Sequence, residues 1–374
     1  MNGLRLVVTS DWHLDAYTAG YARFKDVGHA VECVVRAVEE AVREVGAECV
    51  LFVFLGDLCD PDANRSPRCI AVAVRVAQRL RKMGVRSRWL NGNHDVIEDG
   101  TGTSTLSPLE ALDSDEVMIR VLSRPDVEVI RGVTFCWLPY VPRALAYDPV
   151  EFVHRAHAAA PEVDVVAGHL NVPGIIPASE TVDMGRGREE WFPLEAVREL
   201  WPQAVLMNGH YHRAHADLAR TGPVLVPGSL ARLTFGEQHN EPGYLDVRLS
   251  QTPGTYQATF HRVPTRLLVT MPPADGDRLP DDMTGALVRV IPPADATRDD
   301  VEEAIAIGRN RGAIAFKVHP GPTSPVELPL APQVATARAR GARAVVEELG
   351  GKAVGVNRET LAAWLDQVMS EVGL

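Results

Sequence analysis

Apolar runs alternate with amphipathic segments over the first 95 residues. The run 4–8 is typical of a short strand, and segment 24–45 carries valines at helical spacing. The run 49–55 is apolar at every position, as expected for a strand covered on both faces. A second helical pattern at 69–83 precedes another strand that ends within 85–95. This alternation predicts a largely parallel sheet with helices packed against it.

Later parts of the chain predict a second sheet and a small appended unit. A length of 374 residues exceeds one ordinary domain. Beyond Pro264, two short strands flank a helical piece, which predicts a small α+β unit, and an amphipathic helix closes the chain. The apolar runs of the second sheet lie at 133–140, 163–169, 204–210 and 222–229. The strands of the appended unit lie at 286–291 and 313–318, its helix at 298–309, and the final helix at 358–372.

Composition narrows the class of protein. Hydrophobic residues make up 46% of the chain and charged residues 23%, which is ordinary for a soluble globular protein. No apolar run reaches the roughly 18 residues that span a bilayer, and the N-terminus lacks a secretory pattern. We therefore expect a cytoplasmic protein without membrane contact. The five cysteines form no C-x-x-C pair, which argues against a disulfide framework and a thiolate zinc site.

Charge argues mildly against a protein that coats nucleic acid. The net charge is −11, although the stretch 75–88 carries six basic residues and no acidic one. A solvated helix face with its following loop is the favoured explanation of this stretch. Local contacts to DNA are the alternative.

Polar clusters directly follow five of the apolar runs. Each alone has a simpler explanation: an Asn-Gly turn, a helix N-cap at Asp57, or a histidine satisfied at a strand end. Together they indicate a site, because strand ends of α/β sheets converge on one crevice. Carboxylates and imidazoles without thiolates favour Mn, Fe or Zn. The clusters are Asp11-Trp12-His13, Gly56-Asp57 with Asp60, Gly92-Asn93-His94-Asp95, Gly168-His169 and Gly209-His210-Tyr211-His212.

The ordered set D-x-H, G-D-x-x-D, G-N-H-D, G-H and G-H-x-H resembles the calcineurin-like metallophosphoesterase superfamily. The resemblance implies a four-layer α/β/β/α sandwich, two divalent metal ions, most often Mn²⁺, and hydrolysis of phosphoesters. It makes His94 the proton donor to the leaving oxygen or an electrostatic stabiliser, with Asp60 holding its tautomer. It places one metal on Asp11, His13, Asp57 and His212, and the other on Asp57, Asn93, His169 and His210.

A finer resemblance is to the SbcD-type DNA repair nucleases. It rests on "FCWLPYVPR" at 135–143, "GHYHRAH" at 209–215 and the stretch 226–247 with its Pro-Gly-Ser, Phe-Gly-Glu and Gly-Tyr. It implies a nuclease domain at 1–263, a DNA-capping domain at 264–332 and a docking segment at 333–374. It also implies a homodimer that works in DNA repair and recombination with an SbcC-type coiled-coil ATPase. The expected docking stripe is Leu361, Trp364, Leu365 and Met369.

Other members of the superfamily supply the alternatives. Pro61 stands where phosphoprotein phosphatases of this superfamily carry Arg, which argues against a phosphoprotein substrate. A phosphodiesterase or phosphatase on small nucleotides is the second reading, and a metal-free scaffold the third. Asp60 fits the bacterial arrangement, because archaeal and eukaryotic relatives carry His there. The segment 96–116 does not match the nuclease pattern, and 275–300 is acidic for a DNA-facing surface.

Overall fold

The protein was analysed as a computed structural model. It describes residues 3–319, and its described residues apart from Pro293–Asp295 belong to one compact unit. Within 3–319, the residues left undescribed are 61–65, 97–102, 114, 116, 143–144, 146, 174, 176–190, 216–223, 251, 253 and 273–278. The predicted docking segment at 333–374 therefore lies outside the described residues.

A six-stranded sheet forms the first half of the sandwich. Its strands run in the order β13-β12-β1-β4-β5-β6. The strands predicted from the first apolar runs are β1, β4 and β5, and they lie parallel to one another and to β6. The last two strands of this sheet extend it, with β12 antiparallel to β1 and β13 antiparallel to β12. Their bounds are β1 Arg5–Thr9, β4 Val50–Phe54, β5 Arg86–Leu90, β6 Ile119–Leu122, β12 Gly243–Leu249 and β13 Tyr256–Arg262.

A five-stranded sheet forms the second half, in the order β11-β10-β9-β8-β7. All four predicted runs are in it, and β7 joins as an antiparallel edge strand through a short turn into β8. The other pairs are parallel. The bounds are β7 Asp126–Ile130, β8 Val133–Leu138, β9 Val165–Gly168, β10 Val205–Asn208 and β11 Val224–Leu225.

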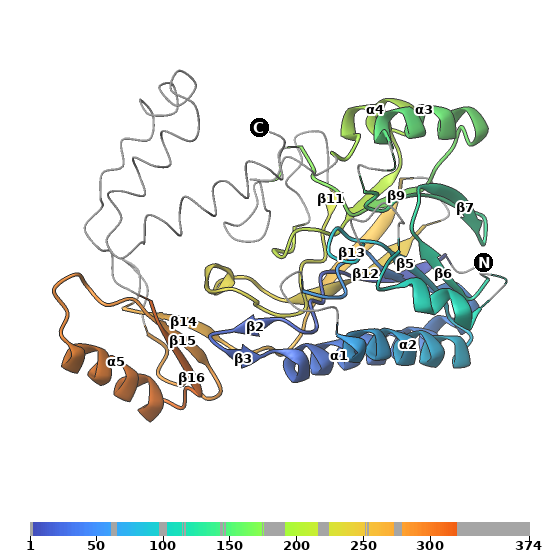
Figure 1. Cartoon of the computed structure of the whole chain (residues 1–374). Helices are drawn as coiled ribbons and strands as arrows, with labels where there is room; N and C mark the ends of the chain where they lie inside the picture. The colour runs from blue at the N-terminus through green and yellow to red at the C-terminus, as the bar shows by residue number, and fades with distance from the viewer. Residues whose placement is uncertain are drawn as a thin grey trace, which may run out of the picture. The chain divides into compact units, whose positions relative to one another are not determined.

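Alternating side chains bury each sheet on both faces. Leu6 and Val8 of β1 face Trp137 of the second sheet in a core between the sheets, whereas Val7 faces the helices. Helices α1 and α2 cover the first sheet, and α3 and α4 cover the second (Figure 1). The arrangement is the predicted four-layer α/β/β/α sandwich. The bounds are α1 Phe24–Val45, α2 Pro67–Lys82, α3 Pro149–Ala159 and α4 Leu194–Leu200.

A third, smaller sheet follows the sandwich. Its parallel strands β14 Leu268–Met271, β15 Leu287–Val290 and β16 Ala315–Val318 pack against α5, Arg298–Asn310. Thr297 begins α5 with a reciprocal capping box to Asp300. The predicted strands and helix of the appended unit are thus confirmed within its described residues. Its independence as a domain stays a prediction.

Side-chain contacts join the third sheet to the sandwich. Leu268 and Leu287 pack with Phe235, and Tyr21 lies against this cluster. Arg266 donates to both the Asp26 carboxylate and the Tyr21 hydroxyl. The hairpin β2 Tyr17–Thr18 with β3 Tyr21–Ala22 carries Tyr21, and 3₁₀ turns span Ala47–Cys49, Ser107–Leu112 and Phe235–Glu237.

Two expectations about side-chain environment have different outcomes. All five cysteines are free thiols, and four of them are buried, as predicted. The prediction that the basic stretch 75–88 is wholly solvated is wrong, because Arg88 on β5 is only 1% exposed and pairs with Glu128. Arg79 is also engaged, by Glu32 and Glu39 of α1. No described helix is both long and apolar enough to cross a bilayer.

Candidate metal centre

The predicted clusters lie in loops at the carboxyl ends of parallel strands from both sheets. Asp11 follows β1, Asp57 follows β4 and Asn93 follows β5 in the first sheet. His169 follows β9 and His210 follows β10 in the second sheet. Because the two sheets face each other across a shared core, these loops meet at one edge of the sandwich.

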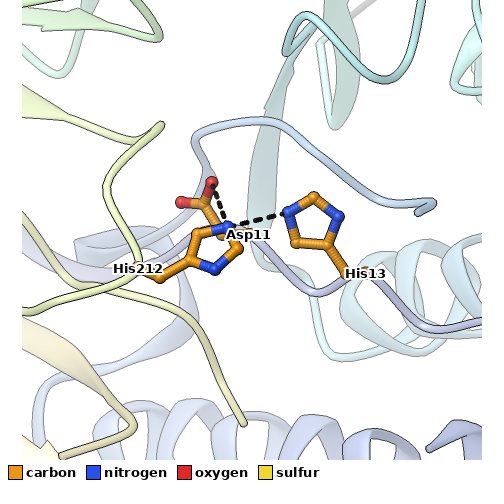
Figure 2. A group of neighbouring side chains, drawn as sticks. All are labelled: Asp11, His13 and His212. Atoms are coloured by element: carbon orange, nitrogen blue, oxygen red, sulfur yellow. Dashed lines mark hydrogen bonds and ion pairs between the residues drawn. The ribbon is translucent and has the colours of Figure 1, made fainter. Parts of the chain in front are cut away.

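Two groups of possible ligands form at this edge. Asp11, His13 and His212 make the first, and their ligand atoms all lie within 4.8 Å of one another. Figure 2 shows the two imidazole rings and the carboxylate directed toward one another. Asp57, His169 and His210 make the second group, within the same limit of 4.8 Å. All of these side chains are buried.

Asp57 lies between the two groups. Its Oδ2 is 3.2 Å from His169 Nε2 in one group and 3.7 Å from His13 Nε2 in the other. Asn93 belongs to the second group, since its Oδ1 is 3.1 Å from His169 Nε2 and 3.1 Å from His210 Nδ1. The structure therefore brings together all seven predicted ligands, with the carboxylate of Asp57 in the bridging position.

The backbone is strained where it presents these side chains. Asp11, His13, Asp57 and His210 all have positive φ, at 51°, 42°, 63° and 74°. Non-glycine residues rarely adopt this region, and such outliers cluster at functional sites. Asp95 holds the loops in place, because its carboxylate accepts the backbone N–H groups of Asp57, Leu58 and Gly92.

Three of the four candidate ligand imidazoles are oriented through Nδ1, whereas Nδ1 of His210 faces Asn93 Oδ1. His13 Nδ1 lies 3.1 Å from the carbonyl of Cys59, and His169 Nδ1 contacts the carbonyl of Leu55. His212 Nδ1 lies 3.0 Å from Glu237 Oε1. An N–H donated to each oxygen leaves Nε2 as the ligand atom, which is how metal-binding histidines are usually held.

The residues fit divalent cations on two observations. Both carboxylate oxygens of Asp11 are buried without a hydrogen-bond partner among the described residues. The Nε2 atoms of His13 and His212 lie 3.1 Å apart beside this carboxylate. A cation bound here would satisfy the orphaned carboxylate and take both imidazole nitrogens as ligands. Oxygen and imidazole donors without thiolate suit Mn, Fe or Zn.

Comparison with known proteins decides the family. Residues 4–214, more than half of the chain, match the model of the family described as calcineurin-like phosphoesterase. The chain belongs to this family. Calcineurin-like phosphoesterases are hydrolases that use divalent metals, and the two residue groups are the candidates for that metal centre here.

Two solved structures match this calcineurin-like phosphoesterase at low sequence identity. A dimetal phosphatase from Danio rerio is 13% identical, with a TM-score of 0.44 over 69% of this chain and 99% of the other. A 5′-nucleotidase from Candida albicans is 14% identical, with a TM-score of 0.35 over 69% of this chain and 51% of the other. A search of curated proteins finds no match.

Electrostatics keeps the carboxyl group of Asp57 ionised. Burial alone would raise the pKa of Asp57, but the imidazoles of His169 and His94 outweigh burial and hold this pKa well below its usual range. Burial lowers the pKa of His169, yet the Asp57 carboxylate more than offsets it and raises the pKa to about 9. Asp57 is therefore a carboxylate.

His94 has the position of a group that acts on substrate. Its ring Nε2 is 3.9 Å from Asp57 Oδ2, its backbone N–H donates to Asp57 Oδ1, and its side chain is 22% exposed. When bound, two divalent cations supply Lewis-acid catalysis to the phosphate oxygens and lower the pKa of the attacking water. His94, at the open side, can pass a proton to the leaving oxygen.

The role of Asp60 stays a prediction. Its backbone N–H donates to Asp15 Oδ1, and the Ser66 N–H donates to Asp15 Oδ2, so the Asp15 carboxylate accepts from both backbone groups. Asp15, Cys59 and Cys69 form a third group of possible ligands. A hydrogen bond with Cys69, together with burial, raises the pKa of the Cys59 thiol, so Cys59 stays a neutral thiol in this group.

Sequence patterns missed three residues that support the centre. Glu237 pairs with His212, Asp95 holds the loops, and Asn171 Oδ1 lies 3.3 Å from His210 Nε2. The sequence offered a signal for Glu237, which stands in the Phe-Gly-Glu of the nuclease-like stretch, and for Asp95 in G-N-H-D. Nothing in the sequence around Asn171 distinguishes it.

Proposed function

We propose that this phosphoesterase cleaves phosphodiester bonds of DNA at a two-metal centre, as an SbcD-type nuclease. One observation carries the proposal. The stretch 226–247, which resembles the end of that nuclease domain, supplies the Glu237 carboxylate that orients His212. The resemblance therefore involves residues of the centre itself and extends beyond the general phosphoesterase motifs.

The assignment of metals and roles belongs to this proposal. One cation lies on Asp11, His13, Asp57 and His212, and the second on Asp57, Asn93, His169 and His210, with Mn²⁺ in both positions. His94 donates the proton to the leaving oxygen. The appended α+β unit is attached close to the same stretch, since Phe235 packs on Leu268 and Leu287. This placement supports a capping role for the unit.

The test is cleavage of linear, hairpin-ended and single-stranded DNA with Mn²⁺, beside bis-p-nitrophenyl phosphate. Asp57→Asn is the control for contaminating nuclease, because it removes the bridging charge and retains the volume of the side chain. DNA cleavage by the wild type and none by the variant supports the proposal. Hydrolysis of the small diester without DNA cleavage, with or without the ATPase partner, rejects it.

A phosphodiesterase or phosphatase for small nucleotides is the second candidate. It is favoured by the ion pairs of the basic stretch 75–88, because Arg79 and Arg88 already pair with acidic side chains of the protein and are not free to bind DNA phosphates. Arg88 in particular is too buried to contact a DNA backbone. Activity on a cyclic or linear nucleotide diester, with DNA untouched, would establish this candidate.

The partners of the nuclease are also part of the proposal. We propose a homodimer that binds an SbcC-type ATPase through Trp364 and Leu365, which lie outside the described residues. Their replacement by Asp should abolish co-purification with such an ATPase while leaving hydrolysis of bis-p-nitrophenyl phosphate intact. Unchanged co-purification would show that the partner binds elsewhere or not at all.

A further inference from the structure

A cavity of about 380 Å³ lies next to the metal centre, on the side of β12 and β13. Its walls include Val226, Leu245 and Phe260, and its polar lining includes His215 and Asn240. The volume falls within the roughly 300–1,000 Å³ of pockets that bind small molecules. The combination of apolar walls with a few polar groups is also that of a ligand site.

Two segments of chain build both the cavity and the metal centre. The first runs from His212, a metal-site residue, to His215, whose backbone is paired with Val226 on both its N–H and C=O. The second is the turn from Glu237, the partner of His212, to Asn240, whose N–H donates to the Glu237 carbonyl. The cavity and the metal centre therefore share these two backbone segments.

Two polar atoms of the cavity residues lack partners. His215 is 9% exposed and Asn240 is 6% exposed. His215 Nε2 and Asn240 Nδ2 have no hydrogen-bond partner among the described residues. Burial lowers the pKa of His215 to about 4, so the ring is neutral at pH 7. Buried polar groups are nearly always hydrogen-bonded, so this pair indicates a missing partner.

We propose that this cavity binds the nucleobase of the substrate nucleotide whose phosphate lies at the metal centre. The inference rests on the proposed function, because it needs a phosphoester that carries a base. A base presents a flat face to Phe260 and donors and acceptors along its edge to His215 and Asn240. Arg213, which is exposed at the cavity, supplies a positive charge that can pair with a phosphate of the same nucleotide.

Binding requires a small rearrangement. The two unpartnered nitrogens are shielded from solvent, so their side chains must turn toward a base that enters. Changes of rotamer are common when ligands bind to a preformed backbone. The same chemistry would recognise a base at a DNA end or in a free nucleotide, and the experiment separates these two sources.

The experiment compares two diesters with the same leaving group. p-Nitrophenyl thymidine 5′-phosphate carries a base, and bis-p-nitrophenyl phosphate carries none. The variants are Asn240→Leu and His215→Leu, with Asn240→Asp to retain volume while removing the amide donor. Gln257→Leu, an exposed amide on β13, is the matched control. Binding of thymidine 5′-monophosphate and of inorganic phosphate is measured by calorimetry with Mn²⁺ present.

We expect each cavity variant to lower kcat/KM for the thymidine diester by about tenfold or more, chiefly through KM, the size of one lost hydrogen bond to a buried group. Hydrolysis of bis-p-nitrophenyl phosphate should change by less than about twofold. Equal effects on both diesters, no effect on either, or no wild-type preference for the thymidine diester overturns the proposal.

The remaining outcomes separate this inference from the proposed function. If the wild type hydrolyses neither diester and does not cleave DNA, the proposed function fails, and the cavity is judged by calorimetry alone. Thymidine 5′-monophosphate binding that Asn240→Leu weakens then supports a base site, and equal affinity for the nucleotide and inorganic phosphate rejects it. If the same variants also lose DNA cleavage, the bound base belongs to DNA. If they lose only hydrolysis of the thymidine diester and binding of thymidine 5′-monophosphate, the ligand is a free nucleotide.

Discussion

Glu237 Oε1 lies 3.0 Å from Nδ1 of His212, with both side chains buried. The carboxylate comes from a 3₁₀ turn 25 residues after the histidine, and it fixes the ring so that Nε2 faces His13 and Asp11. Burial lowers the pKa of His212, but Glu237 more than offsets it and raises the pKa to about 9. This pair connects the family's last motif to the stretch that follows it.

Replacing Glu237 by Gln should weaken binding of metal at the Asp11–His13–His212 group. The amide can still accept from Nδ1–H, but it lacks the charge that makes the imidazole a better ligand. Loss of such a partner typically costs about 10- to 100-fold in metal affinity. Calorimetric titration with Mn²⁺ measures it. Glu241→Gln, at an exposed carboxylate, is the control, and equal affinities in the two variants would contradict the assigned role.

His94→Ala should lose catalysis and keep its metals. Because His94 Nε2 faces Asp57 from the partly open side of the site, its loss removes a proton donor while leaving both ligand groups complete. General acid catalysis is typically worth about 10²- to 10⁴-fold in rate. The check is kcat together with metal content by mass spectrometry. The control is His29→Ala, on the exposed side of α1; a variant that also loses its metals would make His94 a ligand.

Much of the fold can be predicted from the local pattern of hydrophobic residues. The hydrogen bonds that hold the site residues in place cannot. The helix predicted at 24–45 has the bounds Phe24–Val45, because valines at helical spacing bury one face. The ligands could be predicted because each directly follows an apolar strand. Asp95 and Asp57 are 38 residues apart, and their pairing depends on how two loops meet in space. The hydrophobic periodicity of a sequence does not indicate a contact of this kind.

Gly92→Ala should disable the centre through sterics alone. A Cβ at Gly92 would lie 2.1 Å from Asp57 Oδ1 and 2.5 Å from the Asp57 nitrogen, so the bridging carboxylate must move. We expect activity to fall by about 10²-fold or more, as for other displacements of about 1 Å in active sites. Steady-state hydrolysis of bis-p-nitrophenyl phosphate measures it.

Gly28→Ala is the matched control for that substitution. A Cβ at Gly28 meets nothing within 4 Å, and the residue lies inside α1. Alanine there should leave activity unchanged and stabilise the protein by about 0.5–1 kcal/mol, because glycine loses more backbone entropy in a helix. Wild-type activity in Gly92→Ala would show that the loop relaxes without moving Asp57.

Arg88→Ala should destabilise the protein without a direct effect on DNA binding. Arg88 on β5 donates to both oxygens of Glu128 on β7, so this ion pair joins the two sheets of the sandwich. Trp137 also donates to Glu128, at 3.3 Å. Removing one partner of a buried pair leaves an uncompensated charge and costs about 3–5 kcal/mol. The expected loss is at the lower end, since Arg120 remains 3.7 Å from Glu128.

Chemical denaturation measures that loss, and Arg75→Ala provides the comparison within the same basic stretch. Arg75 is exposed on α2, so its removal should change the free energy of unfolding by no more than about 0.5 kcal/mol. If the stretch 75–88 were instead a DNA-binding face, both variants would fold with wild-type stability and bind DNA more weakly, with a smaller dependence on salt. The contrast between a buried and an exposed arginine thus separates the structural role from the electrostatic one.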